Sequence, residues 1–196
     1  TAYNRGQVIY RMAEMLEGRK AEFIELIMLS TGATTKIATA EVEASVDRLV
    51  HYAGWTDKLA AVLGSSNPVS SPYFSYSVPE PTGVVGILAP SRSPLLGLIS
   101  VIAPVITGGN ACLAIAAEED PCIAITFAEV VATSDVPAGV INILTGKMSE
   151  LAPHLAGHAD VNALDLTGAA AELRRSLEEA AAETVNGRRA PMRPPG

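Results

Sequence analysis

The stretch that most constrains this fold is 83–121, where two short apolar runs flank a longer one. Val84–Leu88 and Cys112–Ala116 are rich in Val, Ile and Leu, which is typical of strands buried on both faces of a parallel sheet. Between them, Pro94–Thr107 begins with a proline and is followed by two glycines, as expected for a buried helix. The stretch therefore predicts a β–α–β unit.

The rest of the chain extends this pattern. Helices are expected before it at 5–17, 19–30 and 35–62, then a Ser/Pro/Gly loop at 64–71 and a half-buried strand at 72–78. After it we expect helix 121–131, strand 139–144, helix 148–155, strand 161–166 and helix 170–184. Alternating strands and helices predict an α/β fold, with N-terminal helices followed by a doubly wound, Rossmann-like parallel sheet.

This order suggests four parts. They are an N-terminal helical part at 1–64, a loop and strand at 65–82, a Rossmann-like domain at 83–187 and a Pro/Arg-rich tail at 188–196.

Composition narrows the function classes. A hydrophobic fraction of 48% with 18% charged residues is typical of a folded α/β domain. The net charge of −7, without a basic stripe, argues against a nucleic-acid partner. The uncharged run 93–117 is interrupted by prolines and glycines, which argues against a membrane span. Two cysteines without a spacing pattern indicate reduced core thiols and a cytoplasmic protein.

The start of the chain leaves its origin open. No secretory signal precedes the first expected helix, and Thr1 stands where a Met would begin a complete polypeptide. The alternatives are a fragment, a processed product and an excised domain.

Several motifs together resemble the aldehyde dehydrogenase superfamily. The matching residues, in register, are Tyr52–Lys58, Glu80-Pro81, Gly83–Gly86, Pro90, Pro94-Leu95, Ala103-Pro104, Gly109-Asn110, Ala117-Glu118, Pro121, Pro137–Asn142 and Leu166–Gly168. The resemblance covers nearly the whole chain and implies the N-terminal, NAD-binding half of that fold. It also implies that the chain stops before the catalytic domain.

The resemblance implies that the catalytic positions have changed. The family's nucleophilic Cys lies in the second domain, and neither Cys112 nor Cys122 falls on its motif, so both are expected to be structural thiols. Arg92 stands where the family has the Asn that stabilises the oxyanion, next to Ser91 in place of a Trp. Arg92 either faces solvent or binds an anion.

The general base and a metal site are also in doubt. Alignment on Pro191 places Val185 at the position of the family's basic Glu, whereas a two-residue shift places Glu183 there. His154 and His158 have a spacing that can chelate zinc on a helix, but no third ligand is near, so we expect a structural role and no metal.

The cofactor positions are divided between retained and altered residues. Those that keep a vestige of the family's NAD(P) site are Pro90, Glu118, Thr167 and Gly168. Three positions depart from it. Ile115 stands where the family has a Lys that binds the ribose, and Met148 and Leu173 stand where it has glycines that let the cofactor approach closely. The sequence therefore predicts that no cofactor binds tightly.

Three functions remain in competition. The first is a catalytically inactive unit with a structural or assembly role, most like the non-catalytic second unit of tandem-unit aldehyde dehydrogenases, sometimes called family 16. In the family, strand 72–78 belongs to an oligomerisation flap whose partner hairpin comes from the far C-terminus. Its edge would here be unpaired, and so open to a catalytic unit or a second copy.

The other two functions require a ligand. The second is the N-terminal, NAD(P)-binding part of a divergent NAD(P)-dependent aldehyde dehydrogenase, which oxidises aldehydes to acids. The third is a binding module for a small anion near Arg92 and Thr167-Gly168.

Overall fold

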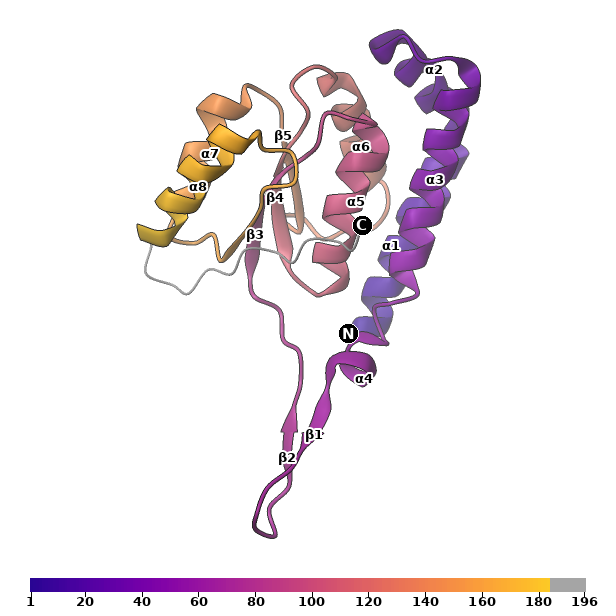
Figure 1. Cartoon of the computed structure of the whole chain (residues 1–196). Helices are drawn as coiled ribbons and strands as arrows, with labels where there is room; N and C mark the ends of the chain where they lie inside the picture. The colour runs from indigo at the N-terminus through magenta and orange to yellow at the C-terminus, as the bar shows by residue number, and fades with distance from the viewer. Residues whose placement is uncertain (184–196) are drawn as a thin grey trace.

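A computed structural model describes residues 1–183 (Figure 1). Its helices are α1 (Ala2–Gly18), α2 (Lys20–Thr31), α3 (Thr35–Ala53), α4 (Leu59–Leu63), α5 (Pro94–Thr107), α6 (Pro121–Ala132), α7 (Met148–Ala156) and α8 (Ala171–Glu183). Its strands are β1 (Ser65–Asn67), β2 (Ser75–Ser77), β3 (Val84–Leu88), β4 (Ala111–Ile115), β5 (Ile141–Leu144) and β6 (Ala163–Asp165).

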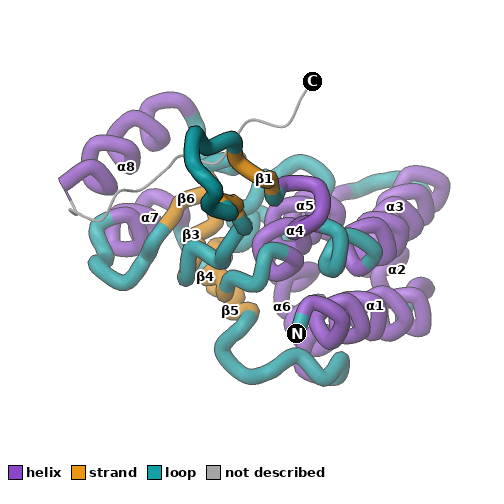
Figure 2. Tube along the Cα trace, turned by 90° about the horizontal axis from the view of Figure 1, so that it is seen from below, coloured by secondary structure: helices purple, strands orange, loops and turns teal. Residues whose placement is uncertain are grey.

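The centre of the fold is a parallel sheet with strand order β5-β4-β3-β6. Helices α5 and α6 cover one face, and α7 and α8 lie on the other (Figures 1 and 2). In the register, Leu88 pairs with Ile115, and Ile115 with Leu144, so these strands end at one edge of the sheet. This arrangement confirms the doubly wound α/β fold expected from the sequence.

The larger hydrophobic core, which we call cluster 1, joins the N-terminal helices to the sheet. Apolar residues at helical spacing in α1 (Ile9, Met12, Leu16) and α3 (Val42, Leu49) are buried against α5 and α6. The result is a further layer of helices, formed by α1, α2 and α3 outside the α5/α6 layer (Figure 2).

The smaller core, cluster 2, lies between the other face of the sheet and helices α7 and α8. Its buried members are Leu88, Ile115, Met148, Ala152, Leu155, Ala156, Val161, Leu164, Leu166, Leu177 and Ala181. Helix α8 packs mainly on α7, so it forms the outer wall on that side.

The turn between α5 and β4 explains two of the retained residues. Gly109 has a φ of 86°, in the left-handed region that favours glycine. The side-chain oxygen of Asn110 accepts hydrogen bonds from the backbone N–H groups of Thr82 (2.6 Å) and Gly83 (3.0 Å). The turn therefore fixes the entry into β3.

One expected helix is divided in two. The run 35–62 was predicted as continuous, but α3 ends at Ala53, and α4 begins only at Leu59. The Thr56 hydroxyl donates to the carbonyl of Ala53 (3.0 Å), and the Lys58 ammonium donates to the carbonyl of Gly54. These side chains satisfy carbonyls that a continuing helix would have bonded, so the chain turns here.

The strand expected at 72–78 is part of a hairpin that the sequence did not predict. The predicted loop 64–71 contains β1, which pairs antiparallel with β2 in a hairpin that projects from the body (Figure 1), and β2 is shorter than the strand expected at 72–78. The side-chain amide of Asn67 donates to the hydroxyls of Ser77 (3.0 Å) and Ser75 (3.4 Å). A Ser-Ser-Asn strand has no apolar alternation, so the pattern did not reveal it.

The remaining predicted elements are present with small shifts at their ends. Within the described chain, no helix is both long enough and apolar enough to cross a membrane. Val185 and the tail 188–196 lie outside the described residues. The division into four parts stays a prediction.

Candidate functional site

The candidate site lies at the edge where the parallel strands end. The loops after β3, β4, β5 and β6 carry Pro90 and Arg92, Glu118, Met148, and Thr167 with Gly168. Ligands of doubly wound folds bind outside the carboxyl ends of such strands. The topology therefore brings the predicted site residues to one edge.

Two of the three altered cofactor positions belong to cluster 2, and the third packs against it. Ile115 is completely buried at the end of β4, and Met148 is buried at the start of α7. Leu173, in the first turn of α8, is half-buried and packs against the same cluster. These side chains contribute apolar packing and no hydrogen-bond donor where the resemblance implied a polar contact or a glycine.

Glu118 has an internal partner. Its carboxylate accepts a hydrogen bond from the backbone N–H of Met148, the first residue of α7. A carboxylate at this place also interacts favourably with the positive end of the helix dipole. Within the described residues, this retained side chain therefore caps a helix.

Thr167 and Gly168 form a tight connection between β6 and α8. The Thr167 hydroxyl and backbone N–H both donate to the Asp165 carboxylate, at 2.5 Å and 2.9 Å. Gly168 donates to the Leu88 carbonyl at 2.8 Å, and a Cβ at this position would lie 2.2 Å from the carbonyl oxygen of Ala89. The close packing against the end of β3 therefore requires a glycine here, whether or not a ligand binds.

Arg92 lies in an exposed loop between β3 and α5. In the described part of the chain, its side chain makes no hydrogen bond or ion pair, and Ser91 beside it is exposed as well. Ser93 has a φ of 53°, which is rare for a non-glycine residue. The loop lies close to the first turn of α5, where Gly97 leaves room for Pro90.

Glu41 holds the start of α5, a role that the sequence did not predict. Its carboxylate reaches from α3 and accepts hydrogen bonds from the N–H groups of Leu95 (3.0 Å) and Leu96 (3.3 Å). Burial raises the pKa of the Glu41 carboxyl, while these two bonds oppose the shift. The available signal was its place on the buried face of α3, between Ala38 and Ser45.

A family model confirms the resemblance that these motifs suggested. The model of the aldehyde dehydrogenase family matches residues 1–188. This chain belongs to the aldehyde dehydrogenase family.

Curated relatives agree with this assignment and are much longer. The chain is 31% identical over 167 residues to an omega-crystallin of Enteroctopus dofleini, which covers 85% of this chain and 33% of that relative. It is 30% identical over 184 residues to cytosolic aldehyde dehydrogenase 1 of Elephantulus edwardii, which covers 93% and 36%. The chain thus spans about a third of the length of these relatives.

Solved structures share the fold. A putative aldehyde dehydrogenase from Burkholderia cenocepacia superposes with a TM-score of 0.89 at 28% identity, over 97% of this chain and 39% of that one. The NAD+ complex of an aldehyde dehydrogenase from Bacillus cereus gives 0.87 at 25% identity, over 97% and 38%. The chain therefore keeps the fold of this part of the family.

Membership of this family implies an NAD(P) cofactor, but the described residues are poorly suited to bind it. Ile115 offers no donor, the Glu118 carboxylate is bonded to the start of α7, and Thr167 is bonded to Asp165. The first turn of α8 also carries the acidic Glu172, which disfavours a pyrophosphate there.

The thiols do not resemble an activated nucleophile. Cys112 is buried in β4, and burial raises the pKa of its thiol to about 12, so little thiolate forms at neutral pH. Cys122 is exposed on α6, which lies on the other face of the sheet from α7 and α8. Cys112 is therefore a core thiol as expected, whereas the expectation of a core thiol was wrong for Cys122, which lies on the outer side of its helix.

The other predicted residues lie on α7 and α8 or directly after α7. Glu183 is the last residue of α8. The Nδ1 atom of His158 accepts a hydrogen bond from the backbone N–H of Asp160 (3.2 Å). Among residues 1–183, no group of three or more His, Cys, Asp or Glu side chains could hold a metal ion.

Proposed function

We propose that this chain is a catalytically inactive unit of the aldehyde dehydrogenase family whose role is structural. The observation that carries the proposal is cluster 2. Ile115, Met148 and Leu173 pack together on the face of the sheet that ends at the candidate site. Their side chains stabilise the fold at positions where the resemblance implied contacts with a cofactor.

Polar groups at the strand ends support the same conclusion. Glu118 and Thr167 bond within the chain, and the first N–H groups of α5 are bonded to Glu41. A ligand would have to break these bonds before forming its own, and each broken bond to a buried group reduces affinity. The site therefore offers few free donors to a dinucleotide.

The β1–β2 hairpin supports a role in assembly. Tyr73, Phe74, Tyr76 and Val78 are all more than half exposed, and the rings of Phe74 and Tyr76 lie 5.4 Å apart. Each strand of a two-stranded hairpin has an outer edge that can pair with another chain, and exposed aromatic rings are enriched at interfaces. We propose that a protein partner, either a catalytic unit or a second copy, binds the edge at 72–78.

Two free thiols fit a reducing compartment, so we propose a cytoplasmic location.

A second candidate function is the cofactor-binding part of an NAD(P)-dependent aldehyde dehydrogenase. The fold similarity to an NAD+ complex and the retained Thr167-Gly168 turn favour it. An anion-binding module is the third candidate, because Arg92 is exposed at the same edge.

Cofactor binding distinguishes these functions. We expect no thermal stabilisation of the chain by 1 mM NAD+, NADH, NADP+ or NADPH. A ligand with a Kd of about 10 μM would stabilise the folded state by about 2.7 kcal/mol at that concentration, so true binding would be evident. A micromolar Kd for any of the four would contradict the proposal.

Two further results would favour the other candidates. Phosphate binding that is lost in Arg92→Ala would indicate an anion site. Aldehyde-dependent NADH formation by the longest natural polypeptide would indicate an enzyme, if randomising Arg92 and Ile115 abolishes it.

A further inference from the structure

Strand β5 lies at one end of the row of parallel strands and pairs, within the described chain, with β4 alone (Figure 2). The carbonyls of Val140 and Leu144 accept hydrogen bonds of 2.9 Å from residues of β4 and its end, so they point toward that strand. Because successive residues of a strand turn their backbone groups to opposite sides, the N–H and C=O groups of Ile141 and Ile143 point away from the sheet. No described residue is bonded to them.

The sequence of β5 does not protect this free edge. Natural proteins protect a strand edge with charged side chains, with prolines or with a covering segment. Residues 136–146 contain no charged side chain, and β5 itself contains no proline. Strand β6, at the opposite edge of the sheet, is shorter and contains Asp165. Of the two edges, β5 is therefore the better suited to pair with another strand.

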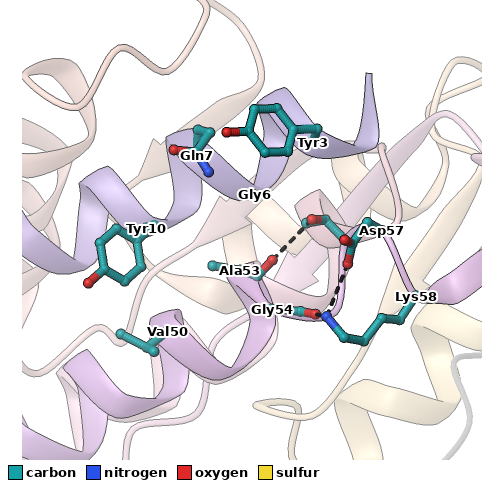
Figure 3. Close-up of a pocket in the computed structure, with 10 residues that line it drawn as sticks. Tyr3, Gly6, Gln7, Tyr10, Val50, Ala53, Gly54, Asp57 and Lys58 are labelled. Carbon is teal, nitrogen blue, oxygen red and sulfur yellow. Dashed lines mark hydrogen bonds and ion pairs between the residues drawn. The ribbon is translucent and has the colours of Figure 1, made fainter.

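The apolar surface beside β5 is open as well. Helix α7 packs on β3 and β4, and an apolar hollow of about 300 Å³ between α7 and the sheet has Leu113 and Leu144 in its lining. Leu144 is 40% exposed. A hollow between α1 and the end of α3 differs from it, because helices and a turn line it and its Lys58 ammonium is bonded within the chain to the Asp57 carboxylate (Figure 3). Apolar surface thus adjoins unpaired backbone groups at β5.

The sequence around β5 is nearly symmetric about Asn142. Ile141 and Ile143 stand on either side of it, followed by Val140 and Leu144. If this strand pairs antiparallel with a copy of itself about Asn142, Ile141 lies opposite Ile143, and Val140 lies opposite Leu144. Apolar side chains that lie directly opposite each other stabilise a pair of strands. The strand is therefore complementary to itself.

We propose that β5 pairs antiparallel with β5 of a second copy of this chain, about a twofold axis at Asn142. Ile141 and Ile143 of one copy then exchange backbone hydrogen bonds with Ile143 and Ile141 of the other, which satisfies the groups that point away from the sheet. The two sheets become one continuous sheet, and each exposed Leu144 gains an apolar neighbour. The contact is isologous, because both copies use the same surface.

The uncharged edge allows two acidic chains to meet. Each copy has a net charge of −7, so the copies repel each other at a distance, whereas residues 136–146 contribute no charge to the contact. Salt screens such repulsion, so added salt should leave the association unchanged or strengthen it. A contact limited to a strand edge buries less than about 1,200 Å², which is typical of weak and reversible complexes.

This contact is independent of the structural role proposed above. It uses neither the strand-end site nor the hairpin edge at 72–78, so each surface can be tested without the other.

A disulfide at the twofold axis tests the register of the pair. The variant is Asn142→Cys, combined with Cys122→Ser because Cys122 is exposed and would itself be oxidised. The backbone of Asn142 faces β4, so two copies of this residue form a pair without mutual hydrogen bonds, with Cα atoms about 4.5 Å apart, within the range of a disulfide. Mild oxidation of a dilute sample should therefore give a covalent dimer.

The matched control is Leu144→Cys in the same Cys122→Ser background. Leu144 is on the same strand and is also exposed. In the proposed register its counterpart in the second copy lies about 13 Å away along the strand, too far for a disulfide. The control should stay monomeric. Equal yields of covalent dimer from the two variants, or no dimer from Asn142→Cys where the natural chain associates, would overturn the pairing.

Charges at the axis provide the second test, by sedimentation equilibrium. Asn142→Glu and Asn142→Lys each place like charges opposite each other, so each should reduce the association constant at least tenfold. An equimolar mixture of the two should form a mixed dimer at least tenfold more stable than either variant alone, because opposite charges then meet at the axis. Tyr76→Glu adds the same charge to the exposed hairpin strand β2 and should change nothing.

A second edge variant allows for a fold that depends on Asn142. Its side-chain amide donates to the carbonyls of Cys112 (3.0 Å) and Gly139 (2.9 Å), and Leu144→Glu leaves these bonds intact while adding a charge to the edge. Leu144→Glu should also weaken association at least tenfold. Circular dichroism and denaturant titration check that each variant is folded.

Four results of the sedimentation experiment would overturn the proposal. They are no association of the natural chain at submillimolar concentration, equal association in Asn142→Glu and Leu144→Glu, association that salt abolishes, and association that only Tyr76→Glu abolishes. The third would indicate ion pairs elsewhere on the surface. The fourth would place the contact between copies at the hairpin, so failure of one proposal does not decide the other.

Discussion

The hydrophobic cores on the two faces of the sheet differ in the family positions that they contain. Cluster 1 joins α1, α3, α5 and α6, and it contains matched family positions such as Val85 and Ala103. Cluster 2 is smaller and contains Ile115 and Met148, two of the altered positions. Both altered positions named here therefore lie on the face beside the candidate site, where they contribute apolar packing. Packing can preserve a fold after the contacts for a ligand have changed.

The largest effect is expected in cluster 1. Phe127 is completely buried in α6, and Phe127→Ala should lower the free energy of unfolding by about 3–5 kcal/mol, because it leaves a cavity in a well-packed core. Denaturant titration measures the change. A loss below about 1 kcal/mol would mean that cluster 1 does not dominate stability.

A smaller effect is expected in cluster 2. Leu177 is buried in α8, which packs mainly on α7, so Leu177→Ala should cost about 2–3 kcal/mol, the lower part of the range for Leu→Ala. Hydrogen exchange should show amides of α7 and α8 opening before those of α5. If all of these helices exchange together, the two clusters form one cooperative unit.

Glu41 links the layers at the start of α5. Glu41→Ala should cost about 1–2 kcal/mol, since it leaves the N–H groups of Leu95 and Leu96 without their acceptor. Chemical denaturation at neutral pH measures the loss. Glu41→Gln is the matched control, because its carbonyl keeps an acceptor but does not titrate.

The pH dependence of Glu41 has a definite sign. Its pKa is raised in the folded state, so its titration favours folding below the ordinary carboxyl pKa of about 4.3. That contribution is lost as the pH rises through the raised value. The stability of the natural chain relative to Glu41→Gln should therefore fall across this window, and a rise would contradict the burial of the carboxylate.

The smallest effect concerns the thiols. Cys122 should react with a thiol reagent at pH 8 with little change in stability, whereas Cys112 should react only after unfolding. Thiol titration in native and denaturing buffer should give one and two equivalents. Two native equivalents would show that cluster 1 opens readily near β4.

Patterns in the sequence predicted the elements that cluster 1 and the sheet require. The start of α5 at Pro94 and the turn at Gly109 follow from the conformational limits of proline and glycine. The hairpin was missed because β1 is polar and its stability depends on pairing with β2. Local patterns do not encode such pairing.

The sequence predicted which residues lie at the candidate site better than it predicted which groups those residues contact. The altered residues Ile115 and Met148 were recognised, but their membership of one cluster depends on how α7 crosses the sheet. The partner of Glu118 is a backbone N–H thirty residues away, and Glu41 reaches α5 from another layer. Contacts of this kind depend on tertiary structure, which periodicity does not describe.

The projecting hairpin has a practical consequence for handling the protein. Its tip, 68–72, is exposed and separates α1–α4 from the sheet domain, yet α3 packs extensively against α5. A protease cut at the tip should therefore yield two pieces that remain bound through cluster 1. The same position would allow the halves to be expressed separately and recombined, as in a split-protein reporter.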